Sequence, residues 1–401
     1  RMLVRRILLG VSLGFALLFS VASAQDPPPR AIECRRDASV CARISVGGDP
    51  ASTTPSFSGH ADPALVADPT HPERIWMAYT FLRGRPARGA NGRPVGVPHT
   101  STHLAVSDDR GATWRLSGTL WNSDLVADPE GQGPASYFGS ETPSLAATRD
   151  ATGVTWYSVR LSYFLEPVTA YRPRYASGWV MRVAKAQGPT PGALASAEDV
   201  ALGVRTTAAA YGGHVDLNAL APELADCAMW NNPAIAAQAG RVYIIPECLV
   251  FRGRNIDQQR SRMIVISAQQ NGAPSQWRWR YDGVLADRAL AQALGSERLV
   301  SAVIVRGRNG GLLFIATPQT GRGPFGQGCV ALALESLDPP RLRRSSDGAP
   351  VIVARQTARG DRTWHTGACA YDASSETGIV TVAATTRRGL RAELRATGLR
   401  P

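Results

Sequence analysis

One phrase recurs along this chain and limits what it can fold into. The phrase starts with a polar residue, often followed by proline, and continues as a short apolar run, a turn and a second apolar strand. The clearest copies are Asp62–Ala67 with Arg74–Tyr79, Thr142–Ala147 with Val154–Ser158, and Asn232–Ala236 with Arg241–Ile245. Weaker copies are Arg298–Val303 with Leu312–Ile315, and Gly367–Tyr371 with Ile379–Ala383. Such internal repetition predicts an array of equivalent β units.

Further strands follow each pair of runs. Third strands are expected at His103–Val106, Trp179–Val183, Met263–Ile266, Val330–Leu334 and Arg391–Arg395. Fourth strands are expected at Trp114–Leu116, Val200–Leu202, Trp277–Tyr281 and Val351–Ala354. The last copy has no fourth strand of its own, but a spare strand, Ala42–Val46, precedes the first copy. We therefore expect an all-β propeller of five four-stranded blades closed by this N-terminal strand, because closure hides the strand edges.

The turn before Trp114 has a specific sequence, Ser107-Asp108-Asp109-Arg110-Gly111-Ala112-Thr113-Trp114. Asp109 can accept backbone N–H bonds, Gly111 can adopt positive φ, and Trp114 has a large apolar surface to bury. The pattern S-x-D-x-G-x-T-W resembles the Asp-box (BNR repeat) of sialidase-type β-propellers. The matching positions are Ser107, Asp109, Gly111, Thr113 and Trp114. In that family the box is a structural turn at the blade edge, so the resemblance implies a fold and not a chemistry.

The resemblance covers the repeats from about His60 to the C-terminus, and Ser267–Gly272 reads as a decayed second box. Sialidases have six blades, so six is the alternative to five; the segment Gly203–Cys227 can contain irregular strands. An unrelated β-sandwich is the other alternative.

Sialidases bind the substrate carboxylate with an arginine triad and use a tyrosine nucleophile, a glutamate and an aspartate. The resemblance offers Arg298, Tyr371 and Glu141 for such roles. The first arginine of the family's triad lies in an Arg-Ile-Pro motif, and the counterpart in this chain is Arg43-Ile44-Ser45, with serine in place of proline.

The first residues are typical of a secretory signal peptide: Arg5-Arg6, an apolar run from Ile7 to Val21, and Ala22-Ser23-Ala24. We expect a leader at 1–24, an N-terminal segment with the closing strand at 25–59, and the propeller at 60–401. The expected location is secreted or periplasmic. Cysteines in an even number favour disulfides in such a compartment. The expected pairs are Cys34–Cys41 and Cys227–Cys248, which leaves Cys329–Cys369 by elimination.

The formal net charge is +12 at pH 7, and Lys185 is the only lysine. The arginines are scattered, so biased composition explains the charge better than a nucleic-acid partner does. No nucleic-acid motif, phosphate loop, zinc-ligand spacing or Ser–His–Asp order is present, and no later stretch is apolar enough to span a membrane. We expect no cofactor and no metal.

Loop length points to one face of the propeller. The connections Arg83–Ser101, Gly118–Ser140, Leu161–Gly178 and Gly203–Asn231 are long, and all lie on the face where the inner strands begin. Long irregular segments in a compact domain often carry function. The aromatic stretch from Tyr163 to Tyr175, with Tyr171 and Arg172, belongs to this face and can cover an axial pocket.

Residues at the start of each inner strand converge on the axis of a propeller. They are His60, Asp62, Glu141, Thr142, Asn231, Asn232, Glu297, Arg298, His365 and Thr366. Glu247 ends a second strand at the same rim. Glycoside hydrolysis needs two carboxyl groups that are about 5 Å apart for retention or about 6.5–9.5 Å apart for inversion. The candidates for this pair are Asp62, Glu141, Glu247 and Glu297, each of which can instead have a purely structural role.

Two functions fit these residues. The first is an exo-acting glycosidase whose catalytic pair comes from those four acids, with Arg298, His365, Asn232, Tyr171, Arg172 and Tyr371 as substrate-binding residues. Five-bladed glycosidases resemble this pattern in placing carboxylates at inner-strand starts. The second is a non-catalytic propeller that binds a glycan, another polar or anionic ligand, or a protein partner through its long-loop face. A catalytic carboxyl pair at the pocket floor distinguishes the first function from the second.

Overall fold

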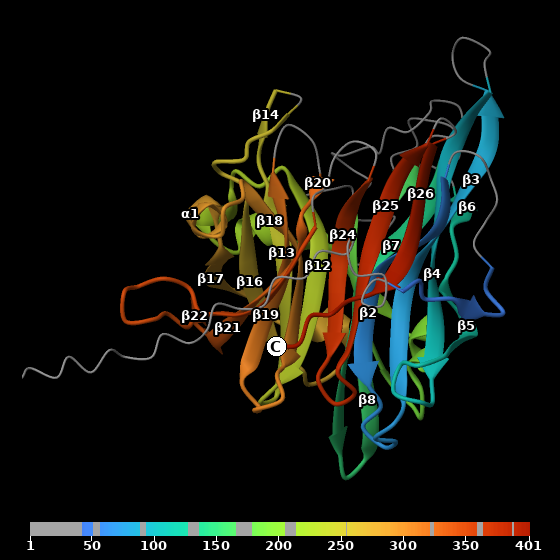
Figure 1. The fold of residues 1–401 in the computed structure, drawn as a ribbon, viewed down its shortest axis with the longest axis horizontal. Coiled ribbons are helices and arrows are strands. Elements are labelled where there is room, and N and C mark those ends of the chain that lie inside the picture. The colour runs from blue at the N-terminus through green and yellow to red at the C-terminus, as the bar shows by residue number, and fades with distance from the viewer. Residues whose placement is uncertain are drawn as a thin grey trace, which may run out of the picture.

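The computed structural model describes residues 42–50, 57–88, 94–126, 136–165, 179–204, 214–253, 255–320, 325–358, 364–386 and 389–401. The predicted leader, the pair Cys34 and Cys41, and the residues Tyr171 and Arg172 lie outside these ranges. The described part consists almost entirely of β-strands, which confirms the all-β prediction (Figure 1).

The first two groups of strands are antiparallel meanders. The first meander comprises β2 (Phe57–Ala67), β3 (Ile75–Arg88), β4 (Pro94–Ser107) and β5 (Trp114–Trp121). The second comprises β7 (Ser136–Asp150), β8 (Gly153–Leu165), β9 (Val180–Gln187) and β10 (Asp199–Gly203). Short strands flank the second meander, β6 (Asp124–Val126) beside β7 and β11 (His214–Asp216) beside β10.

Three more meanders follow in the chain. The third comprises β12 (Met229–Gln238), β13 (Arg241–Leu249), β16 (Arg262–Gln269) and β17 (Arg280–Ala286). The fourth comprises β18 (Arg298–Arg306), β19 (Leu312–Thr320), β21 (Gly328–Leu337) and β23 (Ile352–Thr357). The fifth comprises β24 (Trp364–Asp372), β25 (Thr377–Thr386) and β26 (Gly389–Ala396).

The remaining elements are short. They are the strands β1 (Val46–Gly47), β14 (Phe251–Arg252), β15 (Asn255–Ile256), β20 (Phe325–Gly326) and β22 (Pro340–Leu342), the helix α1 (Arg288–Ala293), and 3-10 turns at Pro191–Ser196, Leu217–Ala219, Pro222–Leu224 and Pro274–Gln276.

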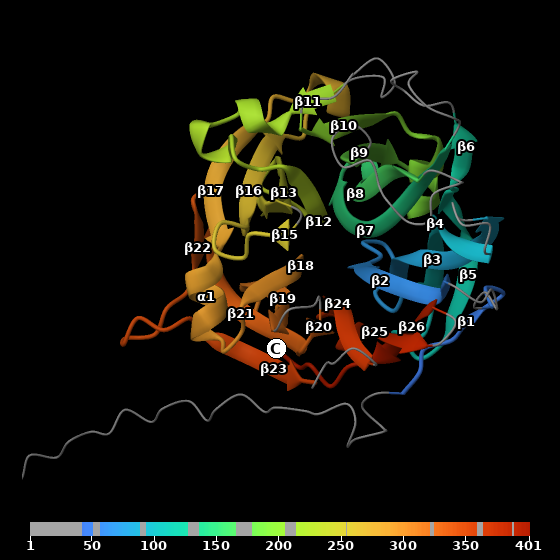
Figure 2. The same ribbon diagram turned by 90° about the horizontal axis from the view of Figure 1, so that it is seen from above.

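The first strands of the five meanders surround a common axis, as Figure 2 shows from above. β2 contacts β7, β7 contacts β12, β12 contacts β18, β18 contacts β24, and β24 returns to β2. The chain is therefore a β-propeller. The N-terminal segment lies beside the fifth and first meanders: Arg43 bridges Arg395 of β26, and β1 runs parallel to β5.

The apolar core is divided among the junctions between neighbouring meanders. The first and second meanders share a cluster that includes Trp76 and Trp156, whose rings meet edge to face at 6.4 Å. The cluster between the second and third contains Tyr157 and Ile244, and the following clusters contain Ile245 with Phe314, Ile315 with Tyr371, and Met77 with Ile379. Each meander thus buries its apolar faces against both neighbours, which is the packing that ring closure requires.

Every inner strand has a β-bulge at the same point. The register shifts between Ala61 and Ala64, between Glu141 and Ser144, between Asn231 and Ala234, between Val300 and Val303, and between Thr366 and Cys369. Four bulge residues have positive φ, namely Asp62 (50°), Thr142 (49°), Asn232 (40°) and Ser301 (55°). This conformation is uncommon outside glycine and is strained for a β-branched residue.

Side chains of the preceding meander satisfy the backbone at these bulges. Thr80 Oγ1 accepts from the Thr142 N–H at 2.9 Å, and Thr381 Oγ1 accepts from the Asp62 N–H at the same distance. A carboxylate oxygen of Glu247 accepts from the Ser301 N–H, also at 2.9 Å. Because these three bulges are bonded from the neighbouring meander, the positions of their side chains at the axis depend on ring packing.

The turn from Ser107 to Trp114 is closed by its own side chains. Asp109 accepts hydrogen bonds from the Thr113 N–H (2.8 Å) and the Thr113 hydroxyl (2.6 Å), while Ser107 Oγ accepts from the Gly111 N–H. These bonds to the charged form lower the pKa of Asp109 to about 2. Thr377 of β25 donates to the Arg110 carbonyl, so the turn also connects the first and fifth meanders.

The limits of some strands differ from those expected from the sequence. The expected loop Arg83–Ser101 is largely a continuation of β3 and β4, which remain paired from Arg83↔His99 to Arg88↔Pro94. That part of the loop prediction is wrong, because a paired extension does not need the apolar alternation by which strands are recognised. The expected fourth strand at Trp277–Tyr281 begins later, at Arg280.

Two predicted disulfides are confirmed. Cys227 pairs with Cys248, and Cys329 of β21 pairs with Cys369 of β24, which connects the fourth and fifth meanders. Within the described ranges, no helix is long and apolar enough to cross a membrane.

Candidate active site

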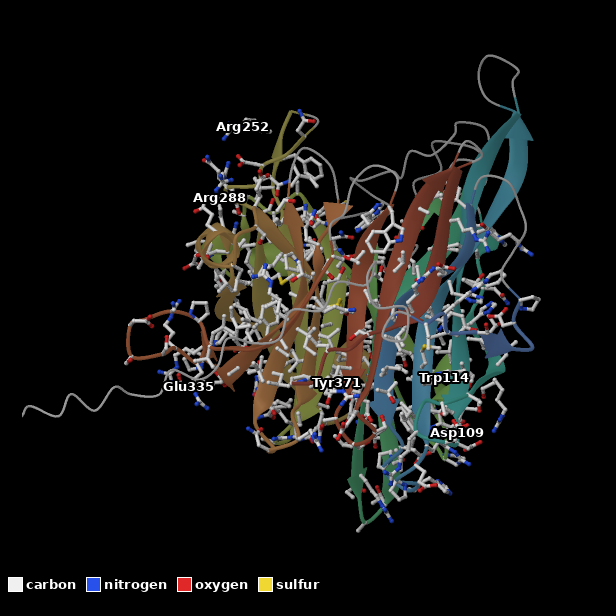
Figure 3. All side chains as sticks on the ribbon, in the orientation of Figure 1. Asp109, Trp114, Arg252, Arg288, Glu335 and Tyr371 are labelled. Atoms are coloured by element: carbon white, nitrogen blue, oxygen red, sulfur yellow. A yellow bond between two sulfur atoms is a disulfide. The ribbon has the colours of Figure 1, made fainter. Side chains whose placement is uncertain are left out.

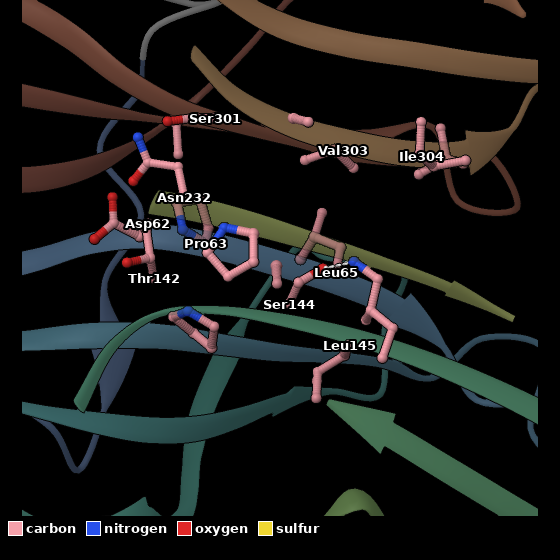
Figure 4. Close-up of a pocket in the computed structure, with 17 residues that line it drawn as sticks. Asp62, Pro63, Leu65, Thr142, Ser144, Leu145, Asn232, Ser301, Val303 and Ile304 are labelled. Carbon is pink, nitrogen blue, oxygen red and sulfur yellow. Dashed lines mark hydrogen bonds between the residues drawn. The ribbon is translucent and has the colours of Figure 1, made fainter. Parts of the chain in front are cut away.

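The bulge residues line a small cavity on the axis. It has a volume of about 30 Å³, and Asp62, Thr142, Asn232 and Ser301 line one end of it. Apolar side chains, among them Leu65, Leu145 and Ile304, line the other end (Figure 4). The four residues with positive φ are thus the residues that form a polar ring at one end of the cavity, next to its apolar part. The Thr142 hydroxyl is buried in this ring and has no hydrogen-bond partner.

Asp62 is an acid that burial makes hard to ionise. Its side chain accepts one hydrogen bond, from Thr80 Oγ1 to Oδ2 at 3.0 Å. Burial raises the pKa of Asp62 to about 6, and the Thr80 bond opposes the rise. Close to neutral pH this carboxyl group can therefore gain or lose a proton.

Glu141 precedes the bulge of the neighbouring inner strand. Burial, together with the charge of Asp62, raises its pKa to about 7. The Tyr163 hydroxyl donates to Glu141 Oε2 at 2.7 Å, which favours the ionised form and lowers the pKa. Both acids are partly buried, and the charge of Asp62 is one of the causes that make Glu141 harder to ionise.

Tyr163 is held from several sides. It is at the end of β8, 4 % exposed, and its ring stacks on Trp179 at a centroid distance of 4.6 Å. Its hydroxyl also hydrogen-bonds to Thr100 Oγ1 at 3.1 Å. The sequence placed Tyr163 in a loop above the pocket; the structure places it in a strand, where it positions Glu141.

Glu247, Asn232 and Arg298 form a separate buried network. Glu247 is 2 % exposed; Oε1 accepts from Asn232 Nδ2 at 2.8 Å and Oε2 accepts from Arg298 Nη2 at 2.7 Å. With the Ser301 N–H, three donors surround one carboxylate. These contacts position Asn232 and Ser301 in the axial ring.

The other predicted residues lie elsewhere. Glu297 is exposed and lines a small cavity beside Glu247 and Arg298. His365 begins β24 at the strand end that faces the axial ring. Tyr371 is at the opposite end of β24, in the half of the molecule that contains Asp109 and Trp114 (Figure 3). There it lines a cavity of about 520 Å³, so the structure separates it from Asp62.

His60 packs in the first meander. Its ring meets Tyr79 edge to face at 5.1 Å, and its Nε2 lies 3.6 Å from a carboxylate oxygen of Asp49. Burial lowers the pKa of His60 to about 4. Asp49 accepts hydrogen bonds from Tyr79 and His103, which together connect the N-terminal segment to β3 and β4.

Thr80, Thr100 and Ser301 were not identified from the sequence as parts of the site. Nothing in their local sequence distinguishes them from ordinary strand residues. A signal was available for the bulges themselves: Pro63, Pro143 and Pro233 follow bulge residues, and proline inside a sheet is confined to edges, strand starts and bulges.

Metal ligands do not gather at this site. In the described ranges, one group of His, Cys, Asp or Glu side chains is close enough to hold an ion, namely Asp226, Cys227 and Cys248. Its two sulfurs are bonded to each other, so they are not available as thiolate ligands.

No family model and no curated protein matches the chain. Among solved structures, the chain is similar to a glycoside hydrolase family 43 arabinoxylan arabinofuranohydrolase from Bacillus subtilis in complex with cellotetraose. The two sequences are 12 % identical, the match covers 89 % of this chain and 66 % of that one, and the TM-score is 0.46. It is also similar to a xylan β-1,4-xylosidase from Bacillus halodurans, with 13 % identity over 80 % and 48 %, and a TM-score of 0.39. An exo-1,5-α-L-arabinanase from a bovine ruminal metagenomic library has 11 % identity over 85 % and 93 %, and a TM-score of 0.44.

The chain thus spans about half to two thirds of the length of the first two enzymes. By their printed names, the first is a glycoside hydrolase, the second a xylosidase and the third an arabinanase. Similarity at this level assigns no residue role and no reaction to the present chain.

Proposed function

We propose that this chain is an exported glycoside hydrolase in which Asp62 and Glu141 are the catalytic carboxyl pair. One observation carries the proposal: two partly buried acids with raised pKa values lie on the neighbouring inner strands β2 and β7, with Asp62 lining the polar end of the axial cavity and Glu141 directly before Thr142, which also lines it. Acids in such an environment are typical of general acid–base catalysis and uncommon in purely structural roles.

The pKa values of Asp62 and Glu141 assign a different catalytic role to each acid. Glu141, with the higher pKa, stays protonated longer as the pH rises and is assigned as the general acid that protonates the leaving oxygen. Asp62 ionises first and is assigned as the base or nucleophile on the other side of the bond. The Thr142 hydroxyl, which has no hydrogen-bond partner and lines the axial cavity, is assigned as a donor to the substrate.

The proposal extends to the architecture. Five meanders around one axis support five blades, and the bridge between Arg43 and Arg395 supports closure of the last blade by the N-terminal strand. On this basis the propeller spans 60–401, preceded by a closing segment at 25–59 and a cleaved leader at 1–24. Two disulfides agree with export to an oxidising compartment. The turn at Ser107–Trp114 supports a relation to sialidase-type propellers.

A panel of fluorogenic glycosides, sialosides and pentosides included, tests this function. The wild type is expected to turn over at least one substrate, and Asp62→Asn and Glu141→Gln are each expected to lower its kcat at least 100-fold. The matched control is Glu335→Gln, an exposed carboxylate on β21 (Figure 3). Absence of turnover across the panel contradicts the proposal and favours the glycan-binding alternative. Turnover that neither site variant reduces retains an enzyme and rejects this pair.

The pH dependence of this activity follows from the same two acids. The active form has Asp62 ionised and Glu141 protonated, so kcat/KM is expected to follow a bell with limbs near pH 6 and pH 7. The limbs belong to the pair and are read as apparent values. A rate that is flat between pH 5 and pH 8 contradicts this assignment.

Tyr163→Phe is expected to move the alkaline limb upward by roughly one pH unit. The substitution removes a donor that stabilises ionised Glu141, so Glu141 holds its proton to higher pH. The matched control is Tyr157→Phe, on the same strand, whose hydroxyl donates to Gln270 in another part of the molecule. An alkaline limb that stays in place in Tyr163→Phe rejects the positioning role.

A further inference from the structure

A buried arginine lies at the junction of the first and second meanders. The Arg160 side chain, on β8, is 6 % exposed, and its Nη2 donates to Asp199 Oδ2 at 2.7 Å. Its guanidinium carbon lies 3.8 Å from the centre of the Trp121 ring, which belongs to β5. The other Asp199 oxygen accepts from Arg182 at 2.8 Å. Arg160 is thus enclosed between an aromatic face and a carboxylate that it shares.

Most of the donors of Arg160 have no acceptor. Its Nε and Nη1 atoms are buried and make no hydrogen bond, although a guanidinium presents five N–H groups. Each buried donor without a partner is costly, and more so in a charged group. Burial also lowers the pKa of Arg160 to about 10, against the opposing effect of Asp199. The junction therefore holds two arginines that share the one Asp199 carboxylate, and Arg160 lacks acceptors for most of its donors.

Two hydroxyl groups on the same strand are in the same condition. Ser158 and Ser162 flank Arg160 at alternate positions of β8, so the three side chains are on one face of the strand. Both serines are at most 1 % exposed, and neither Oγ has a hydrogen-bond partner. Arg160 and one of these hydroxyl groups, two positions away on the same face of β8, can both donate to one acceptor that lies between them.

We propose that the junction of β5 and β8 binds a small inorganic anion of the size of chloride, held by Arg160 together with the hydroxyl of Ser158 or Ser162. A monatomic anion accepts from several donors at once and needs no matching geometry of its own, which suits donors that diverge from one strand. Bound there, it connects the Trp121 side of the first meander to the second meander and stabilises the ring. The proposal is independent of the glycosidase activity.

Bromide and chloride serve as the probes. In crystals of the full chain grown in sodium bromide, an anomalous peak is expected within hydrogen-bond distance of Arg160 Nε or Nη1. In solution, exchanging gluconate for chloride at constant ionic strength is expected to raise Tm in a saturable way, by about 3–4 °C at a hundredfold excess over Kd. Gluconate is too large to enter so closed a site.

Variants separate this site from general salt effects. Two variants are expected to abolish the chloride-dependent rise in Tm: the single variant Arg160→Gln and the double variant Ser158→Ala/Ser162→Ala. This holds whatever the Tm of each variant without chloride. The control is Arg262→Gln, a partly buried arginine whose guanidinium is paired with Asp226, which is expected to retain the rise. Absence of a bromide peak, or an equal chloride effect in the wild type and Arg160→Gln, overturns the proposal and leaves only water at these donors.

Discussion

Glu247→Gln is expected to lower the free energy of unfolding by about 3–5 kcal/mol, because it leaves the buried charge of Arg298 without a partner. The glutamine oxygen can still accept from Asn232 and from the Ser301 N–H, which the Glu247 Oε1 atom serves in the wild type. Its amide nitrogen, however, faces the Arg298 donor that lies 2.7 Å from Oε2. The substitution therefore removes the charge and keeps the shape. Urea unfolding with linear extrapolation measures the difference.

A double-mutant cycle separates the pair from its surroundings. Arg298→Met alone is also expected to destabilise, since it leaves the Glu247 charge buried, whereas the double variant should lose less than the sum of the two. Glu335→Gln provides the surface comparison, because its ion pair with Arg341 is exposed and a change within about 0.5 kcal/mol is expected. A loss below about 1 kcal/mol in Glu247→Gln, or additive single variants, contradicts the structural role of this network.

The repeats in the sequence were sufficient to predict the strands and their order around the axis. The apolar runs of β3, β8, β13, β19 and β25 are buried on both faces, so their composition is informative without any knowledge of their partners. Paired extensions such as Arg83–Arg88 were missed, because their pairing is decided by the neighbouring strand and not by burial. Strand limits were therefore the weakest part of the prediction.

The candidate site was only partly predictable for a related reason. Asp62 and Glu141 were singled out because they start inner strands, but Glu297 and His60 were singled out on the same grounds and lie in different surroundings. The bulge decides between them, since an inserted residue with positive φ redirects the side chains around it. Which strand start lines the axial cavity thus depends on packing between meanders, as at Thr80 and Thr142, and no local sequence pattern contains that information.

Asp62→Asn is expected to stabilise the protein at pH 8 by up to about 3 kcal/mol and to leave its stability at pH 4 nearly unchanged. The pKa of Asp62 is raised from 3.8 to about 6 in the folded chain. The folded state therefore binds more protons than the unfolded state between these values, and stability falls as the pH rises through that window. A shift of about two units at 1.36 kcal/mol per unit amounts to about 3 kcal/mol once both states are ionised. Asparagine, which does not ionise, avoids this loss.

Asp109→Asn is expected to change stability with pH in the opposite direction to Asp62→Asn. The pKa of Asp109 is lowered to about 2 in the folded chain, so its contribution is present above the unfolded value and disappears as the pH falls toward 2. This variant should be less stable than the wild type at pH 7 and converge with it in acid, whereas Asp62→Asn should diverge from the wild type as the pH rises. Chemical unfolding at closely spaced pH values measures both.

Equal stability of Asp62→Asn and the wild type at pH 8 would mean that Asp62 is as easily ionised as a solvated acid, and the case for its place in a catalytic pair would lose its physical basis. A gain confined to high pH would instead show a site that sacrifices stability to keep a carboxyl group poised near neutrality, as expected of an active site and not of a structural turn.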